Sequence, residues 1–541
     1  MFSDDVDRAD VEIGRRTREL HELRIRRNSL IPINRLLPHE VLSTIFVILR
    51  DDAWQLNATL SWTVITRVCH HWRKSARVNP LLWNHIHLTH KTNSFLVKAM
   101  VKLSQKIPLT VHFRISVPSP GRYWDSMLLV LANVDRLKEL HFWVAEDAGK
   151  DDDTQTWLNE SLQKLSRAQL ESLLVWGQRD CWRPSLMIAQ PFFATSMRDL
   201  RIRVSGARDI LALCSSIHSM PSLVDFELHI KSWETEEEEL SMSCKSEDKV
   251  HLRSLQAIFL HGPPRTCAFL LDSIEFSSTT RMTVRCPVSD FPSGLSEMER
   301  FSSLVRILAA KVNDSERYAS LLLHRWSTGG CVINGWHTFC DVQTYYSRMD
   351  VTDLHIVLPT TIALRFCESI REVLRDVQWL YVRAEGSKER WAKIIRNMCG
   401  VQELVLVNEM CSTLPCILGR RDWQPLGTRG VQSLAYGDPR FPPSLPHLQR
   451  LVIETTTFLI DPGPPPGQDV IDLRSFNDTL LARSQQSLGP QSITIATLVG
   501  RRFVIEAVEA GLINLPSYEV VFSEERFQGR ESLCDDDWDQ P

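Results

Sequence analysis

The chain has 541 residues, of which 43% are hydrophobic, enough for one large core or several domains. Its 62 basic and 66 acidic residues give a formal net charge of −4, which argues against a nucleic-acid binder that works by bulk attraction to phosphate. No apolar run approaches the roughly 20 residues that a membrane helix needs, and the first residues are too acidic and polar for a signal peptide. We therefore expect an intracellular protein, cytoplasmic, nuclear or both, with no membrane partner.

The 13 cysteines are scattered along the chain. The closest pair, Cys411 and Cys416, has neither metal-ligand nor redox-motif spacing. We expect reduced, mostly buried thiols and no metal site.

The segment 1–32 predicts a charged helix over residues 7–31. Val11, Leu20, Leu23 and Leu30 form a thin apolar seam among arginines and glutamates. The favoured interpretation is a helix packed loosely on the residues that follow. A short coiled-coil contact and a basic cluster of the nuclear-import kind remain open alternatives.

The segment 33–84 predicts a small all-helical module. Pro38 stands where a helix would begin, and the apolar residues that follow it recur at the spacing of one helix face. A second helix carries Val68, Cys69 and Trp72, and Pro80 stops it. On periodicity alone, this is a helical hairpin buried against the rest of the chain.

Four short motifs follow one another in this module: Leu37-Pro38, Ile45-Phe46, Val68-Cys69 with Trp72, and Leu82-Trp83. Their order resembles an F-box, in the F-box-like form common in fungi. The link over residues 51–63 is longer than in a compact F-box. The resemblance implies docking on the Skp-family adaptor of a cullin-RING ubiquitin ligase. The residues expected to contact that adaptor or to form the second face or core of the module are Leu37, Pro38, Val41, Leu42, Ile45, Phe46, Val68, Cys69, Trp72, Leu82 and Trp83.

The segment 85–530 alternates short strands with helix-like stretches. Strands are expected at 85–88 and 109–115, and helices at 94–104, 157–169 and 207–219. A six-residue signature with apolar positions one, four and six then recurs, mostly every 24 to 33 residues. The copies start at Leu137, Leu170, Met197, Leu223, Leu255, Val351, Val377, Val401, Val431 and Leu448.

This rhythm predicts an irregular leucine-rich-repeat-like β/α solenoid, because each unit supplies one strand and one return. No copy carries the asparagine usual two residues after the sixth position, so the returns are expected to vary. One mixed α/β domain or two domains are the alternatives. Between Thr279 and Asp350 the signature fades, and helices over 296–312 and 315–326, a turn at 328–330 and a strand at 331–333 are expected.

The polar segments 233–248 and 461–468 read as an exposed loop and an extended linker, and residues 531–541 as a disordered acidic tail. Motifs of catalytic, phosphate-binding or metal sites were not found, so no cofactor is expected. The paired His70 and His71 lie within the expected helix, where we expect solvated or core histidines and no metal ligand.

The polar residues that alternate along the expected strands would face a protein substrate. The named candidates are Trp143, Arg201, Arg203, His229, Tyr381 and Arg383. Trp143 and Tyr381 are favoured, because exposed aromatic side chains anchor interfaces.

The sequence thus predicts the α/β class: a small N-terminal F-box-like helical module followed by an irregular leucine-rich-repeat-like solenoid. The expected role is a substrate adaptor of a ubiquitin ligase, with an unknown protein substrate and no nucleic acid. A repeat scaffold whose helices only cap the repeats, and an enzyme with a pocket between the strands, are the alternatives. A cap must bury Val41, Leu42, Ile45 and Phe46, whereas a docking module leaves an apolar patch open.

Overall fold

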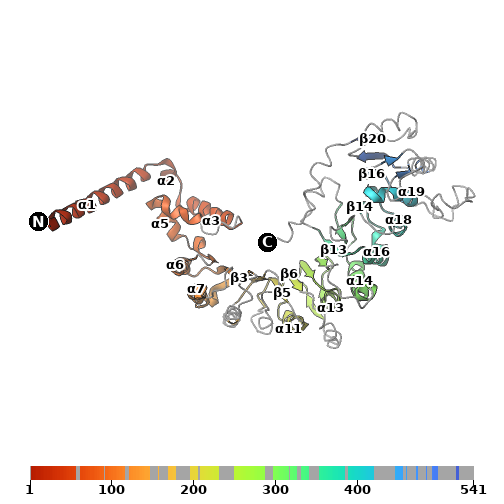
Figure 1. Cartoon of the computed structure of the whole chain (residues 1–541), viewed down its shortest axis with the longest axis horizontal. Helices are drawn as coiled ribbons and strands as arrows, with labels where there is room; N and C mark the ends of the chain where they lie inside the picture. Colours follow the sequence, from red (N-terminus) through yellow and green to blue (C-terminus); the bar gives the residue numbers. More distant parts are fainter. Residues whose placement is uncertain are drawn as a thin grey trace, which may run out of the picture. The chain divides into compact units, whose positions relative to one another are not determined.

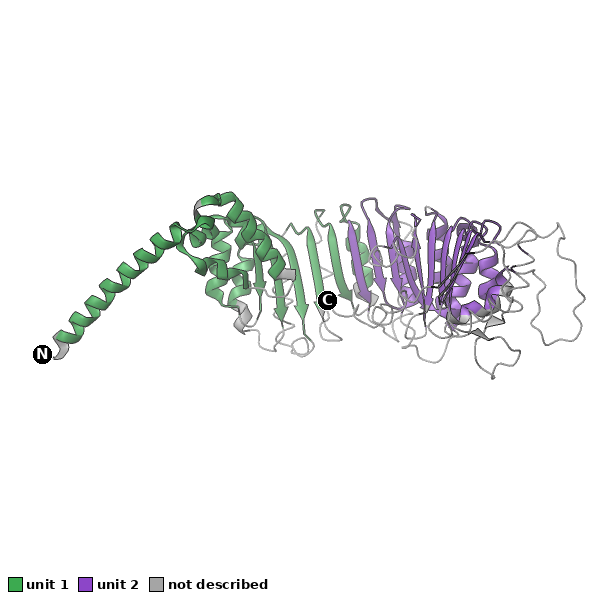
Figure 2. Cartoon of the chain, turned by 90° about the horizontal axis from the view of Figure 1, so that it is seen from above, with its two compact units in different colours: residues 1–223 green, residues 224–541 purple. Residues whose placement is uncertain are grey.

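The structure is a computed structural model that falls into two compact units, residues 1–223 and 224–541, and each is described by itself (Figure 2). The description covers residues 2–55, 61–89, 92–115, 121–145, 156, 169–177, 195–204, 207–230, 249–286, 297–315, 317–325, 330–339, 352–383, 388–418, 445–454, 458–459, 471–472, 480, 483, 490–496 and 519–522.

The first unit begins with a helical module. Its elements are α1 (Phe2–Ser29), α2 (Pro32–Leu36), α3 (His39–Gln55), the 3-10 turn η1 (Ser61–Val64), α4 (Ile65–Val68), α5 (His70–Val78) and the 3-10 turn η2 (Pro80–Trp83). Pro32 and Pro80 each occupy the first turn of a short helix, where a missing N–H costs nothing. Pro38 lies immediately before α3, as the sequence predicted.

The second predicted helix of the module is in fact two helices that meet at Cys69. The backbone of Cys69 is extended, with φ −157° and ψ 174°. Its Sγ accepts a hydrogen bond from the Trp72 backbone N at 3.4 Å and so caps α5. Val68 and Trp72 therefore lie on different helices, contrary to the continuous helix expected from their spacing.

Aromatic side chains form the core of this module. Phe46 of α3 lies 5.2 Å from Trp72, and Trp62 lies edge-on to Trp83 at 5.3 Å between ring centroids. The indole N–H groups of Trp72 and Trp83 are hydrogen-bonded. Trp72 donates to Asn34 Oδ1 at 2.6 Å, and Trp83 donates to the Ala76 carbonyl at 2.7 Å.

A parallel sheet completes the first unit. Its strands are β1 (His85–Leu88), β2 (Leu109–Ile115), β3 (Leu137–Val144), β4 (Ser172–Gly177) and β5 (Asp199–Val204), paired in chain order. Between them come α6 (Ser94–Leu103), α7 (Gly121–Leu131), the short turn η3 (Val134–Arg136) and, after β5, α11 (Ala207–Ile217). One strand and one return per step is the arrangement expected of parallel pairing.

The second unit is organised on a longer, mostly parallel sheet. Its strand order is β6-β8-β10-β13-β12-β11-β14-β15-β16-β19-β20, and only β12 runs antiparallel, to both β11 and β13. The bounds are β6 (Asp225–Ile230), β8 (Ala257–His261), β10 (Arg281–Arg285), β11 (Ser320–Arg325), β12 (Gly330–Trp336), β13 (Leu354–Pro359), β14 (Trp379–Arg383), β15 (Glu403–Val407), β16 (Arg450–Glu454), β19 (Ser492–Ala496) and β20 (Glu519–Phe522). Two small pairs lie apart from it: β7 (Val250–Leu252) with β9 (Ile274–Phe276), and β17 (Phe458–Leu459) with β18 (Ile471–Asp472).

The helices of the second unit lie along one face of its sheet (Figure 1). They are α13 (Pro264–Ser273), α14 (Glu297–Asn313), α16 (Thr360–Ser369), α17 (Arg371–Leu374), α18 (Lys388–Arg396), the 3-10 turn η5 (Asn408–Thr413) and α19 (Leu414–Leu418). Neighbouring helices in the series contact one another, and α16 also contacts β12 and β13. Leu304 and Leu308 of α14 and Phe366 of α16 are fully buried.

The repeated signature predicted the strands well. Each copy overlaps a strand that pairs in parallel with at least one neighbour, apart from the copy at Val431, which lies outside the described residues. β13 is parallel to β10 and antiparallel to β12. The predicted helix over 157–169 also falls outside them, apart from residue 169. The helix predicted over 315–326 is wrong: residues 320–325 form β11, whose leucines are buried on both faces of the sheet. The mixed α/β class and the N-terminal helical region are thus confirmed.

Candidate partner-binding surfaces

The residues predicted to dock on an adaptor separate into a core set and a surface set. Leu42 and Phe46 are fully buried, and Cys69, Leu82 and Trp83 also lie inside the helical module. In the surface set, Val41 and Val68 are exposed over 42% and 51% of their surface, Pro38 is exposed, and Leu37, Ile45 and Trp72 are half-buried. Only this second set can contact a partner without unfolding the module.

The exposed members extend into an apolar stripe along α3. Val41, Ile45 and Ile48 follow one another at helical spacing, and Leu49 lies beside them. Ile48 and Leu49 are 53% and 42% exposed. We call Val41, Ile45, Ile48 and Leu49 the α3 stripe. It borders the face of α3 that buries Leu42 and Phe46, so one helix carries a core face and an open apolar face. Ile48 was not among the predicted residues, although its spacing from Val41 and Ile45 could have revealed it.

A buried arginine fixes α3 to the end of the module. Arg50 is 5% exposed, donates to the Leu81 carbonyl and to Asn84 Oδ1 at 3.1 Å, and pairs with Asp51 at 2.7 Å. These bonds join α3 to η2 and to the residue before β1. The α3 stripe is therefore held on a rigid element.

The sheet of the first unit has one apolar face and one polar face. Along β3 the buried Leu140, Phe142 and Val144 alternate with half-buried residues, and β5 shows the same alternation. Arg201 and Arg203 are half-buried on β5, as predicted for a polar face, and Arg201 pairs with Asp199 at 3.1 Å. Trp143 is also half-buried, and the Arg114 guanidinium lies 4.6 Å from the centre of its ring.

A row of histidines, not predicted from the sequence, crosses the polar face of β1, β2 and β3. The pairing register places His87, His112 and His141 side by side on neighbouring strands, with ring centroids 6.3 and 3.9 Å apart. Burial lowers the pKa of His85, His87 and His141 to about 4, and lowers the pKa of His112 further. The row is therefore neutral near pH 7. The signal in the sequence was the presence of histidine in each of the three strands, two of them in β1 (His85 and His87).

In the second unit, His229 lies on the polar side of β6. Its Nε2 lies 2.8 Å from Glu227, and its ring stacks on Phe259 of the next strand at 4.9 Å between centroids. Arg383 is half-buried at the end of β14. His229 and Arg383 are accessible in part, as the predicted substrate-facing role requires.

The structure corrects the predicted exposure of Tyr381. It was expected to be an exposed aromatic anchor, but it is only 6% exposed. It belongs to a buried cluster with Leu322, Trp336, Trp379, Val405, Val407 and Val452. Both faces of β12 and β15 are buried along their whole length, so the one-face alternation seen in the first unit is lost here. Tyr381 is part of a core.

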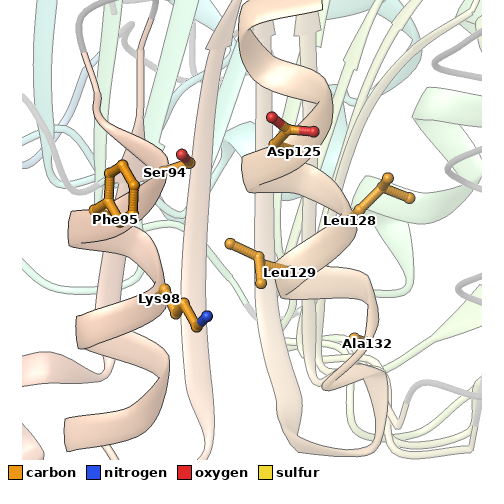
Figure 3. A pocket seen from close by; sticks show the side chains of 7 residues that line it. All are labelled: Ser94, Phe95, Lys98, Asp125, Leu128, Leu129 and Ala132. Carbon is orange, nitrogen blue, oxygen red and sulfur yellow. The ribbon is translucent and has the colours of Figure 1, made fainter.

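A groove of about 420 Å³ separates α6 from α7 in the first unit (Figure 3). Phe95 and Lys98 line it from α6, and Asp125, Leu128 and Leu129 from α7. Phe95 is 80% exposed. The groove is mainly apolar, with one charged residue of each sign.

Among the described residues, no three histidine, cysteine, aspartate or glutamate side chains gather as they would around a metal ion. In that part of the chain, no helix combines the length and the apolar character needed to cross a membrane. The cysteines that the structure describes are free thiols, most of them buried. No known family model and no curated protein sequence matches this chain.

Proposed function

We propose that the chain is a substrate-recognition adaptor of a Skp/cullin/F-box ubiquitin ligase. In this proposal the helical module docks on the Skp-family adaptor, and the strands and helices that follow form an irregular leucine-rich-repeat-like solenoid that presents a protein substrate. The observation that carries the proposal is the α3 stripe, an open apolar surface within the segment that resembles an F-box.

The α3 stripe has the chemistry of a docking surface. Burying apolar surface contributes roughly 25 cal/mol per Å² before the costs of association. An amphipathic helix that is laid against a groove typically binds through residues spaced like Val41, Ile45 and Ile48. Leu42 and Phe46 support the stripe from beneath, because they fix α3 against Trp72 and the rest of the module.

The solenoid interpretation is supported by the regular succession of parallel strands and by the helices along one face in the second unit. The substrate side of the proposal is supported by the polar face of the first unit. Trp143 offers a half-buried ring beside Arg114, and Arg201 and Arg203 add positive charge on β5. Aromatic and arginine side chains dominate binding energy at interfaces.

The test is a binding measurement between the purified full chain and the Skp-family adaptor. The variant Val41→Asp, Ile48→Asp places two charges in the α3 stripe without touching the core. We expect the parent to bind and the variant to lose at least about tenfold in affinity. Phe95→Asp is the control, because Phe95 is an exposed apolar residue outside the α3 stripe, on α6. Substitutions at Leu42 or Phe46 are unsuitable, since they would unfold the module.

Absence of binding by a well-folded parent would overturn the adaptor role. The alternative is then a repeat scaffold whose helical module caps the strands, and the full burial of Leu42, Phe46 and Leu82 within the chain favours that alternative. Binding that is unaffected by Val41→Asp, Ile48→Asp would overturn the docking surface but not the adaptor role.

A further inference from the structure

α1 carries an apolar seam that no described residue of the first unit covers. All side chains from residue 5 to residue 27 are exposed. Val6, Ile13 and Leu20 follow at intervals of seven residues, and Leu23 lies on the same side. Their exposed fractions are 59%, 61%, 48% and 62%. This is the a and d pattern of a coiled coil.

Two details of the seam depend on the position of each residue around the helix. Val11 lies nine residues from Leu20, which is about two and a half turns, so it points to the opposite side of the helix. The prediction that Val11 belongs to the seam is therefore wrong. Arg16 occupies one d position, and its Nε lies 2.9 Å from Glu12 on the flank. Its aliphatic stem can therefore pack in the seam while its charge is neutralised.

Charge is distributed unevenly along the same helix. Residues 2–14 contain five acidic side chains and one arginine, whereas residues 15–29 contain six arginines and two glutamates. Two such helices repel when they lie parallel, because acidic half meets acidic half. They attract when they lie antiparallel, because each acidic half meets a basic half.

We propose that α1 is a self-association element that pairs with α1 of a second copy of this chain in an antiparallel coiled coil. One register matches the flanking charges and most of the seam, and it sets Arg16 opposite Leu20 and Arg27 opposite Ala9. With Ile13 opposite Leu23 of the other copy, Val6 falls opposite Leu30, which is 68% exposed just beyond the helix. The same register places Asp10 opposite Arg24 and Glu12 opposite Arg26 on the flanks.

The register also brings Glu19 of the two copies together at the two-fold axis. Arg15 already holds Glu19 at 2.5 Å within its own helix, which offsets that repulsion. The proposal does not rest on ligase activity, since neither the seam nor the charges involve the α3 stripe.

Association is tested by sedimentation or light scattering of the full chain over a range of concentrations. We expect the mass to rise toward twice 62.2 kDa. Ile13→Asp, Leu20→Asp should raise the dissociation constant by at least about tenfold. Val11→Asp, on the opposite side of the helix, should leave it unchanged. A parent that stays monomeric, a mass of three or more chains, or equal effects of the two changes would overturn the proposal.

Orientation is tested by a charge exchange. Asp10→Arg should weaken an antiparallel pair, because it faces Arg24, and should strengthen a parallel pair, because Asp10 would then lie near Asp5 of the other copy. Adding Arg24→Asp should restore association in the antiparallel case. Strengthening by Asp10→Arg, or failure of the second change to restore association, would overturn the antiparallel arrangement.

Discussion

Neighbouring residues on one helix can have opposite roles, and α3 shows this at residue scale. Leu42 is fully buried and Val41 is 42% exposed, although both are apolar and adjacent. Helix periodicity allows both to lie near the same face, so the sequence could not separate the core residue from the surface residue. The distinction depends on which side Trp72 and η2 cover.

The two positions should respond differently to truncation. Leu42→Ala removes buried atoms beside Phe46 and leaves a cavity, so we expect a loss of about 2–5 kcal/mol in the free energy of unfolding. Val41→Ala should change it by less than about 1 kcal/mol, because its side chain is half in solvent. Urea unfolding of both variants measures the difference, and equal losses would contradict the placement of α3.

Gly400 is a position where the fold requires the absence of a side chain. Its backbone N donates to the Arg375 carbonyl at 2.8 Å, and an added Cβ would lie 2.6 Å from that same oxygen. A backbone oxygen cannot move aside as a flexible side chain could. Gly400→Ala should therefore destabilise the second unit by about 1–3 kcal/mol. Gly14→Ala, where an added Cβ would meet nothing within 4 Å, is the control, and similar effects of both changes on thermal unfolding would contradict this reasoning.

At the scale of elements, the histidine row makes the edge of the first sheet sensitive to acid. The folded-state pKa of His85, His87 and His141 lies near 4, below the ordinary value of 6.5, because burial disfavours the charged ring. Between about pH 6.5 and pH 4 the unfolded chain binds protons that the folded chain excludes. Stability is therefore fully present above pH 6.5 and falls as the pH drops through this window.

In this pH window, each buried histidine should lower the free energy of unfolding by at most about 1.4 kcal/mol for each pH unit. His112→Gln should make the dependence of the urea midpoint on pH less steep between pH 6.5 and 4.5. Nearby charges from Arg50, Asp51, Arg114, Asp199 and Arg201 modulate the effect. His21→Gln is the control, because its side chain is exposed on α1. A steeper fall for His112→Gln would refute the assignment.

Elements with local signals were predictable, and those decided by distant contacts were not. Apolar alternation located strands such as β3 and β5, because one face of each is buried and the other is polar. β11 was wrongly predicted to be a helix. The strand lies between β12 and β14, and its three consecutive leucines give no alternation of apolar and polar residues. Tyr381 was misplaced for the same reason: its strand is buried on both faces.

The break at Cys69 has a related origin. Val68, Cys69 and Trp72 satisfy helical spacing, and no proline or glycine marks an end between them. The extended backbone of Cys69 and its thiol cap depend on how α5 packs against α3. The candidate docking residues do lie in one N-terminal helical region, but local sequence patterns could not divide them into core and surface.

At the scale of the whole molecule, each unit carries its own core. α1 belongs to the first unit but lies outside its core. Leu42, Phe113 and Phe142 are buried in the first unit, and Trp379, Trp391 and Phe366 in the second. No side chain of α1 from residue 5 to 27 is even half-buried. The sequence favoured a helix packed loosely on the module, and the exposure along α1 corrects that expectation.

Removal of residues 2–29 tests this separation. Because no side chain of α1 from residue 5 to residue 29 is buried, the truncated chain should unfold within about 2 °C of the parent, less than the shift that a loss of about 1 kcal/mol would produce. The truncation should nevertheless abolish concentration-dependent association, which Ile13→Asp, Leu20→Asp is expected to weaken. Differential scanning calorimetry and sedimentation on the same samples separate the two effects. A fall of several degrees would show that α1 packs on the module after all, and association that survives the truncation would locate the contact between copies elsewhere in the chain.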